Sequence, residues 1–243
     1  MKRDDWSDDD VCARLRRTDA SALEGDLDAQ GWSVLRDLLT STECDGVASL
    51  YGQDEGFRSR VVMARHGFGK GEYRYFSYPL PSLVQSVRTA LYPRLVPLAN
   101  RWHERMGMSV RFPDKHAEFI ARCAAAGQSR PTPLLLRYGA GDYNCLHQDL
   151  YGEHVFPLQL AVLLSAPATD FKGGEFVLTE QRPRMQTRAA VVPLRKGDAV
   201  VFAVNSRPVR GTRGDYRVKL RHGVSELIEG HRHTLGIIFH DAS

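Results

Sequence analysis

Two histidines and one aspartate of this 243-residue chain could bind a metal ion together. His147 and Asp149 are separated by one residue, and His222 follows 73 residues after Asp149. Two imidazoles and a carboxylate are the ligand set of a facial-triad iron(II) centre, which leaves positions on the metal open for oxygen chemistry. Arg232 lies ten residues after His222, where a cation could bind a dicarboxylate co-substrate. The pattern therefore predicts an iron(II) oxygenase site.

The spacing of the pair favours a shared metal only if the segment is extended. On a strand, residues i and i+2 point to the same face, so His147 and Asp149 can reach one ion. The other histidine–acid pair at this spacing, His116 and Glu118, lies in a helical pattern, where i and i+2 diverge by about 200°. We reject it as a ligand pair. His240 is a weaker alternative to His222 as the third ligand.

Arg232 and Thr234 share a strand face and could bind a carboxylate together. Two neutral imidazoles and one carboxylate leave Fe²⁺ with a net charge of +1, which suits a chelating 2-oxo acid. The far carboxylate then needs a cation, and the planar guanidinium offers two parallel hydrogen bonds. The alternative is a buried Arg232 paired with a core acid. His231 and His233 flank Arg232 and are expected to face away from the site.

Composition and charge restrict the class of protein. Four cysteines without framework spacing favour reduced thiols and exclude a structural zinc site. The acidic N-terminus is not a signal peptide and no apolar run could span a membrane, so we expect a soluble, cytoplasmic protein. Residues 1–56 carry 6 Lys+Arg against 14 Asp+Glu, a net −8, and residues 57–243 carry 27 against 15, a net +12. A basic body suggests an anionic partner, although a solvated arginine-rich surface explains the same count.

Helical patterns dominate the first half of the chain. A first helix is expected after Ser7, with Val11 and Leu15 at helical spacing. Further helices are expected over 21–30 and 41–51, the second of these capped by Ser41 and Thr42, with a strand at 32–35 between them. Residues 83–106 repeat apolar side chains at helical spacing but contain Pro93 and Pro97, which predicts a broken or kinked helix. A further helix is expected over 115–126, ending at Gly127.

Short β-prone runs dominate from residue 131 onward. They are separated by Gly, Pro, Asp and Asn, and they lie at 134–138, 156–164, 175–178, 189–192, 199–202, 216–222 and 234–239. Many strands without intervening helices predict a mainly β, α+β protein with a jelly-roll core. We expect an acidic helical extension at 1–30 and an oxygenase domain at 31–243, with the jelly-roll core at about 131–243. Residues 205–215 are expected to be the longest irregular stretch of the second half.

The order of these elements resembles a known family. The matching segments are Tyr138, His147-x-Asp149, Gly173-Gly174-Glu175-Phe176, Pro193-x-x-x-Gly197-Asp198-x-x-x-Phe202, His222-Gly223-Val224 and Arg232-x-Thr234. Over about residues 30–243 they resemble the double-stranded β-helix of iron(II)/2-oxoglutarate-dependent dioxygenases, most closely the prolyl-hydroxylase-like branch. Residues 65–76 and 221–242 are similar to a bacterial group of oxygenases thought to act on alkylated DNA. Prolyl hydroxylases usually carry lysine where this chain has Arg232, which weakens the case for a prolyl substrate.

The resemblance implies a site and a reaction. His147, Asp149 and His222 would bind iron(II), and Arg232, Thr234 and Tyr138 would bind 2-oxoglutarate. With O2, the co-substrate would be decarboxylated to succinate while a substrate C–H bond is hydroxylated. Hydroxylation of an N-methyl group gives a hemiaminal that loses formaldehyde, so the resemblance implies oxidative demethylation of nucleic acid, as in DNA repair.

Basic and aromatic residues alternate over residues 57–78, which could form a lid that binds phosphates and stacks on an extruded base. A second basic cluster follows at 207–221. The candidate substrate-binding residues are Arg65, Lys70, Tyr73, Arg74, Tyr75, Arg210 and Arg213. The alternative is a hairpin with aromatic core residues and a solvated basic face. Two other functions stay open: a dioxygenase that hydroxylates a protein or a small molecule, and a non-catalytic jelly-roll binding module. The sequence implies no obligate protein partner.

Overall fold

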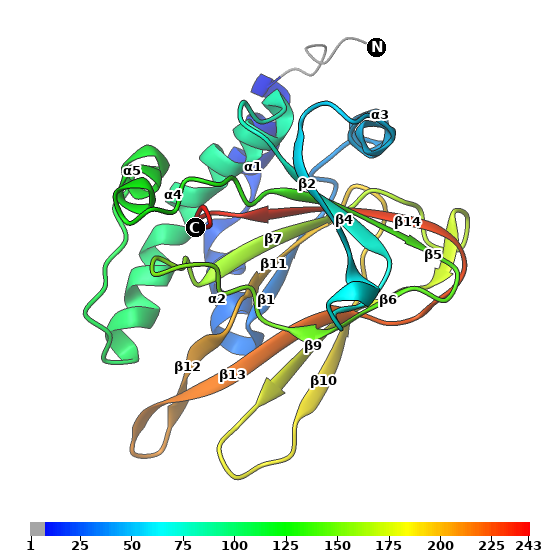
Figure 1. Cartoon of the computed structure of the whole chain (residues 1–243). Coiled ribbons are helices and arrows are strands. Elements are labelled where there is room, and N and C mark those ends of the chain that lie inside the picture. Colours follow the sequence, from blue (N-terminus) through cyan, green and yellow to red (C-terminus); the bar gives the residue numbers. More distant parts are fainter. Residues whose placement is uncertain (1–7) are drawn as a thin grey trace.

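The computed structural model describes residues 8–243, in which two antiparallel sheets face each other and helices cover the outer face of the larger one (Figure 1). The helices are α1 (Asp8–Arg17), α2 (Ala20–Gln30), α3 (Ser41–Ser49), α4 (Ser82–Arg105) and α5 (His116–Ala125), with short 3₁₀ turns η1 (Leu50–Gly52) and η2 (Met63–Arg65). None of the helices in this range is long and apolar enough to cross a membrane.

The larger sheet has the strand order β1-β11-β7-β14-β5-β4-β2, and β8 pairs with β14 at its side. Its strands are β1 (Trp32–Leu35), β2 (Phe57–Val62), β4 (Glu72–Phe76), β5 (Leu134–Gly139), β7 (Leu158–Leu163), β8 (Phe171–Gly173), β11 (Ala199–Ala203) and β14 (Leu227–Ile238). The smaller sheet has the order β10-β9-β13-β6-β3, and β12 pairs with β13. Its strands are β3 (Gly69–Lys70), β6 (Tyr143–His147), β9 (Phe176–Gln181), β10 (Arg188–Val192), β12 (Ser206–Gly211) and β13 (Gly214–Val224). This is the jelly-roll architecture that the strand pattern predicts.

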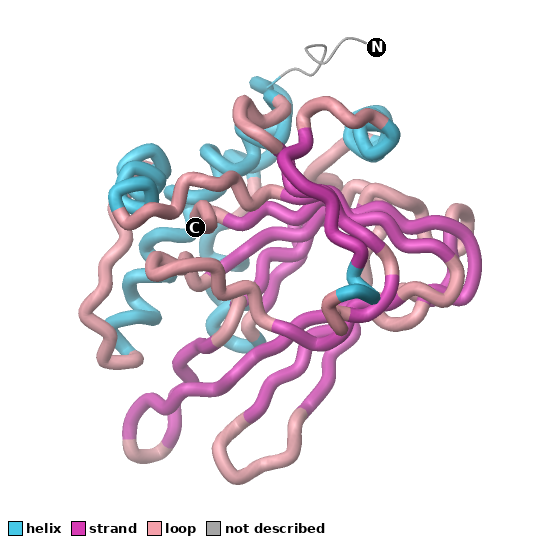
Figure 2. The backbone as a smooth tube through the Cα atoms, in the orientation of Figure 1, coloured by secondary structure: helices cyan, strands magenta, loops and turns pink. Residues whose placement is uncertain are grey.

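Side chains along the strands of the larger sheet point alternately to its two faces, and the apolar ones form two separate clusters. Leu160, Val201 and Ile237 face the helices and belong to the main apolar cluster. Ala161 and Val200 point to the opposite face and pack in a separate cluster between the two sheets. Figure 2 shows the helices gathered on one side of the strands. The space between the sheets is thereby left for a cavity.

The N-terminal segment forms two helices, α1 and α2, as expected, and both pack into the main core. Val11 and Leu15 of α1 and Leu23 and Leu27 of α2 are buried in the same cluster as the larger sheet. Residues 1–7 of the expected acidic extension lie outside the described residues. The division into 1–30 and 31–243 therefore stays a proposal, and the two segments share one core.

Three local expectations need correction. The helix at 41–51 is capped by Thr40, whose side chain accepts from Glu43 N while Glu43 accepts from Thr40 N, and not by Ser41 or Thr42. The break expected at Pro93 and Pro97 is not found, because α4 is one continuous helix whose apolar residues pack into the core; a kink at these prolines stays a prediction. Residues 205–215 are not an irregular loop, because β12 and β13 form a hairpin with Ser206 opposite Lys219.

Candidate metal and co-substrate site

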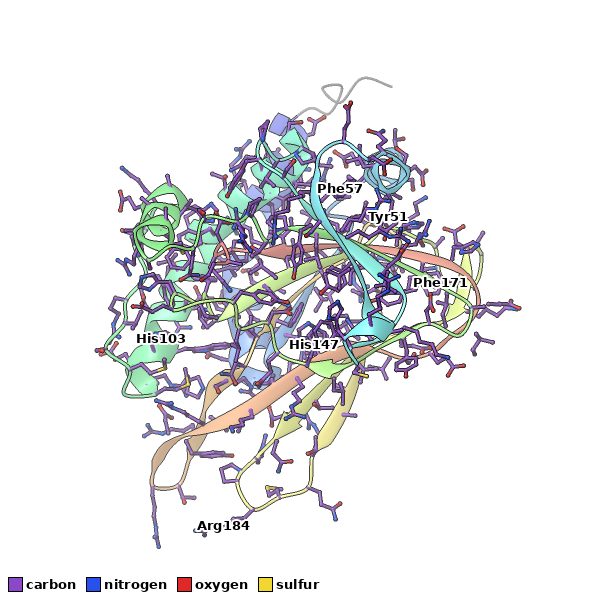
Figure 3. All side chains as sticks on the ribbon, viewed as in Figure 1. Tyr51, Phe57, His103, His147, Phe171 and Arg184 are labelled. Carbon is purple, nitrogen blue, oxygen red and sulfur yellow. The ribbon has the colours of Figure 1, made fainter. Side chains whose placement is uncertain are left out.

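A cavity of about 330 Å³ opens between the two sheets and contains the predicted triad. His147 ends β6, Asp149 follows two residues later, and His222 lies near the end of β13. β6 and β13 are neighbouring antiparallel strands with His222 directly opposite His147, and the ring centroids are 4.2 Å apart. Figure 3 shows His147 beside the tip of the β2–β4 hairpin. The pairing of two strands thus brings together ligands that are distant in the sequence.

The distances between the triad atoms fit a single ion. Asp149 Oδ1 is 3.5 Å from His147 Nε2, and Asp149 Oδ2 is 3.3 Å from His222 Nε2. The three potential ligand atoms all lie within 4.8 Å of one another. Ligands about 2.1 Å from an ion and at right angles to each other would be about 3 Å apart. The triad is therefore arranged for one facial metal site, and within residues 8–243 no other group of His, Cys, Asp and Glu is so arranged.

The hydrogen bonds of His147 direct one ring nitrogen to the metal position. His147 Nδ1 lies 2.8 Å from Cys145 O, a carbonyl that can only accept, so Nδ1 carries the proton. In the neutral ring the lone pair is then on Nε2, the atom that faces Asp149. A backbone carbonyl that fixes the tautomer of a ligand histidine is a common support for a metal site.

The Asp149 carboxylate has a separate hydrogen-bond donor at each oxygen. Tyr151 OH donates to Oδ1 at 2.8 Å, and Gln159 Nε2 donates to Oδ2 at 2.8 Å. The same Gln159 nitrogen is 3.2 Å from His222 Nε2, and the Gln159 side chain is buried. Both donors line the cavity. The orientation of the carboxylate is therefore fixed by the protein.

Electrostatics favour an anionic Asp149 beside two imidazoles. Burial raises the pKa of Asp149, but the neighbouring imidazoles of His147 and His222 outweigh it and hold this pKa well below its usual value. Burial lowers the pKa of His222, whereas the pKa of His147 is raised because Asp149 outweighs its burial. A carboxylate that stays ionised while His222 stays neutral is the protonation state that a divalent cation requires.

Arg232 of β14 lies in the same cavity as the triad, with 1% of its surface exposed. Its Nη1 donates to Thr234 Oγ1 at 2.6 Å, as expected for residues on one strand face. No acid of residues 8–243 forms an ion pair with it, so a pairing with a core acid is not found there. Burial lowers the pKa of Arg232 to about 10, so it remains charged at neutral pH. A buried cation without a carboxylate partner creates a strong demand for an anionic ligand.

Tyr138 of β5 lies opposite Arg232 in the register of β5 and β14, with the Arg232 Cζ 5.6 Å from the Tyr138 ring centroid. Burial raises the pKa of Tyr138 to about 12, so the phenol is protonated at neutral pH and can donate. Tyr138, Thr234 and Arg232 all line the cavity. The structure thus places the three residues predicted to bind a co-substrate together and beside the triad.

The predicted substrate-binding residues separate into two groups. Tyr73 lines the cavity, and Arg65 and Lys70 are exposed on either side of the cavity-lining residues Gly67 and Phe68. The remaining four candidates lie outside the cavity lining and have other contacts. Tyr75 is buried beneath the Arg58 guanidinium, Arg74 donates to Gln53 O, Arg210 lies 3.9 Å from Asp215, and Arg213 occupies the β12–β13 turn.

Four further histidines do not line the cavity. His116 Nε2 lies 2.8 Å from Phe239 O, and His240 Nδ1 accepts from Phe156 N at 3.2 Å. His240 does not line the cavity that contains the triad, which removes it as an alternative to His222. His231 is exposed, and His233 packs edge-on against Tyr51. The rejection of the pair His116 and Glu118 agrees with these contacts.

Sequence reasoning missed Gln159 and Tyr151. Gln159 lies on a strand of continuous apolar pattern, and a polar residue in the middle of such a run is the one signal that could have identified it. Tyr151 lies two residues after Asp149, in a segment without regular secondary structure. The contacts of Gln159 with Asp149 and His222 depend on the packing of β7 against β13.

Comparison with known proteins identifies relatives of the chain. A protein family described as "Oxygenase, catalysing oxidative methylation of damaged DNA" matches residues 71–242. Uncharacterized proteins of two Mycobacterium tuberculosis strains, CDC 1551/Oshkosh and H37Rv, are each 48% identical over 168 residues, which is 69% of this chain and 72% of theirs.

Solved structures with a similar fold include three oxygenases. A Pseudomonas putida prolyl-4-hydroxylase has a TM-score of 0.54 at 15% identity, covering 90% of this chain and 96% of its own. A Trichoplax adhaerens prolyl hydroxylase, in complex with a hypoxia inducible factor peptide, has a TM-score of 0.54 at 14% identity, covering 98% and 96%. A Burkholderia pseudomallei oxidoreductase of the 2OG-Fe(II) oxygenase family has a TM-score of 0.50 at 14% identity, covering 100% and 96%. Likeness at this identity establishes the fold.

Proposed function

We propose that this chain, which belongs to the family of oxygenases described as catalysing oxidative methylation of damaged DNA, oxidatively demethylates alkylated bases in nucleic acid. It is an oxidoreductase, and the cofactors of its class are iron(II), 2-oxoglutarate and O2. The observation that carries the proposal is Arg232, a buried cation without an acid partner in residues 8–243, in one cavity with the triad. A binding module without catalysis has no use for a buried charge of this kind.

Each side chain of the site has a defined task in this proposal. His147, Asp149 and His222 would hold the metal, which supplies oxidation of a substrate C–H bond when it is bound with O2 and 2-oxoglutarate. Arg232 would bind the distal carboxylate of the co-substrate, and Thr234, which accepts from Arg232 Nη1, would orient the guanidinium. Tyr151 and Gln159 would hold Asp149 in position. Hydroxylation of an N-methyl group then gives a hemiaminal that loses formaldehyde.

Free cations at the cavity mouth support an anionic substrate. Arg65 and Lys70 are exposed, and no acid of the described range forms an ion pair with either of them. The other basic residues nearby have partners, since Arg60 and Arg137 both bind Glu72. Phosphates of a nucleic acid would supply the missing negative charges. The cytoplasm, where the sequence predicts the protein, gives access to such a substrate.

Succinate release across methylated oligonucleotides and peptides tests the proposal. We expect turnover on methylated oligonucleotides and none on peptides. Succinate release on a peptide or metabolite, with no oligonucleotide binding at low salt, would establish the alternative of a dioxygenase that hydroxylates a protein or a small molecule.

The salt dependence of binding tests the two free cations. We expect Lys70→Gln and Arg65→Gln each to reduce the slope of log K against log salt by about 1, because each phosphate contact releases condensed counterions. Lys115→Gln is the matched control, since this lysine is 80% exposed and occupies the N-cap position of α5, which lies on the helical side of the molecule (Figure 1). Equal slopes for all variants would remove Arg65 and Lys70 from the interface.

A further inference from the structure

Phe68 presents one open aromatic face at the cavity mouth. It lines the cavity, and 47% of its surface is exposed. The ring of His66 is stacked against it, with centroids 5.3 Å apart and an interplanar angle of 22°. One face of the phenyl ring is therefore backed by an imidazole, and the exposure of Phe68 leaves the other face for a ligand.

The backbone holds Phe68 close to the metal ligands. Cys145 N donates to Phe68 O at 2.9 Å, and Cys145 precedes His147 by two residues on β6. Phe68 N donates to Met63 O at 3.2 Å, and Met63 is fully buried. Gly69 continues the contact by pairing with Asn144. A ring attached in this way needs little additional ordering to bind a ligand, which favours affinity.

The surroundings of Phe68 are apolar and exposed. Leu146, which also lines the cavity, is 44% exposed, and Leu150, next to Asp149 in sequence, is 47% exposed. Phe68 and Leu146, which share the cavity lining, are among eight large apolar side chains with high exposure in the described part of the chain. Clustered exposed apolar side chains mark a binding surface more often than isolated ones do.

The loop that carries Phe68 also carries positive charge. Arg65 and Lys70 begin and end the segment Arg65–Lys70, and this segment contains no acid. The nearest acid in sequence, Glu72, is buried and bound by Arg60 and Arg137. An open aromatic face between two free cations matches a nucleotide, which has a flat ring and a charged phosphate on each side.

We propose that Phe68, backed by His66, is a stacking platform for an unpaired nucleobase that enters the cavity, with Arg65 and Lys70 binding the flanking phosphates. The assignment rests on the proposed function and adds to it the segment and the contact by which the base is recognised. The platform can receive only a base with a free face, which means single-stranded nucleic acid or a nucleotide extruded from a duplex.

The experiment is a binding titration that needs no turnover. The probe is a single-stranded oligonucleotide with one 2-aminopurine, whose fluorescence falls when the base stacks on a ring. The full chain is loaded with Mn(II) and 2-oxoglutarate without O2. We expect Phe68→Ala to weaken binding roughly fivefold to a hundredfold and to abolish the quenching, the range that corresponds to about 1–3 kcal/mol of stacking.

Two substitutions at the same position separate stacking from simple apolar contact. Phe68→Tyr keeps the ring and should bind within about twofold of the wild type, whereas Phe68→Leu keeps apolar volume without a π face and should behave like Phe68→Ala. Ile228→Ala is the control, because Ile228 is 71% exposed and does not line the cavity.

The outcomes distinguish the platform from the proposed function. If the wild type binds and is quenched while Phe68→Ala or Phe68→Leu matches it, the platform is wrong and the nucleic-acid substrate stands. If the wild type binds no oligonucleotide at low salt, the nucleic-acid substrate and the platform both fail. Oligonucleotide binding that is lost in Phe68→Ala and Phe68→Leu but kept in Phe68→Tyr establishes the platform.

Discussion

The hydrogen bonds around Asp149 show how single residues prepare a metal site. A lone carboxylate could rotate between several orientations, whereas Tyr151 and Gln159 each hold one of its oxygens at 2.8 Å. Because the protein itself holds the carboxylate, little ordering of this side chain opposes metal binding. Asp149 also supplies the only negative charge of the triad.

Replacement of Asp149 should remove most of the metal. We expect Asp149→Ala protein, purified anaerobically, to retain little iron(II) by metal analysis, while the wild type holds one ion per chain. Asp54→Ala is a suitable control, because the Asp54 side chain is 99% exposed. Full iron occupancy and turnover in Asp149→Ala would show that the ligands are assigned incorrectly.

Arg232 provides the second test at the scale of a residue. Arg232→Ala should leave iron(II) bound but lower the affinity for 2-oxoglutarate by about thirtyfold or more. Truncating one partner of a desolvated charge pair costs roughly 2–5 kcal/mol. Calorimetric titration of 2-oxoglutarate into metal-loaded protein measures this. Arg232→Lys keeps the positive charge but loses the planar guanidinium, so its affinity for 2-oxoglutarate should lie between those of the wild type and Arg232→Ala. An unchanged titration would remove Arg232 from the co-substrate site; Arg221 and Lys219 cannot replace it, because they lie on the exposed face of β13 and do not line the cavity.

β13 shows how one element serves two surfaces. Because side chains alternate along a strand, Val218, Leu220 and His222 are buried, and Arg217, Lys219 and Arg221 are exposed. The second basic cluster of the sequence is therefore largely the outer face of the strand that carries a metal ligand. The basic residues recur at every second position because of strand geometry, so their spacing does not indicate a ligand.

The short pairing of β3 with β6 connects the hairpin tip to the metal site, and Gly69 makes it possible. Gly69 has φ +124°, and a Cβ there would be 2.4 Å from Tyr143 O. We expect Gly69→Ala to break this pairing and to speed hydrogen exchange of the Cys145 amide, which donates to Phe68 O. Gly67→Ala is the matched control, since a Cβ at Gly67 meets open space at φ +70°. Equal exchange of the Cys145 amide in both variants would show that β3 does not hold the tip.

Ion pairs between the N-terminal segment and the body explain much of the uneven charge of the whole molecule. Asp28 of α2 pairs with Arg101 and Arg105 of α4, and Asp45 of α3 pairs with Lys196. The acidic and basic halves that the sequence shows are therefore partly neutralised against each other on folding. The N-terminal helices serve the packing of the larger sheet, and the free cations remain at the cavity mouth.

Acid should destabilise the molecule through buried histidines. Burial lowers the pKa values of His116 and His233 to about 4 and that of His240 to about 3. Unfolded histidines titrate near 6.5, so below that pH the unfolded chain binds up to three more protons than the native one. The free energy of unfolding should then fall by as much as about 4 kcal/mol per pH unit between about pH 6 and pH 4.

Urea denaturation at pH 7, 6 and 5 measures this loss. His116→Gln should reduce the slope of the free energy of unfolding against pH by about 1.4 kcal/mol per pH unit. The unfolded chain of this variant binds one fewer extra proton relative to the native state. A free energy of unfolding that stays constant from pH 7 to pH 5 would show that these histidines protonate in the native state.

The sequence by itself determined the strand pattern, the triad and the Arg232–Thr234 pair, because these depend on local periodicity and on residue chemistry. Alternation along a strand places His147 with Asp149, and Arg232 with Thr234, wherever that strand lies. The jelly-roll class follows in the same way from many short strands separated by turn residues.

Only the tertiary structure decided which distant strands become neighbours, and with them the lining of the cavity. Gln159 contacts Asp149 and His222 because β7 faces β13 across the space between the sheets, and no local pattern contains that proximity. The same holds for the aromatic segment 57–78, in which Tyr73 and Phe68 reach the cavity while Tyr75 is buried. Tyr73 and Tyr75 share one face of β4, and they differ because Arg58 and Tyr151 pack on Tyr75, which no local pattern of residues 57–78 contains.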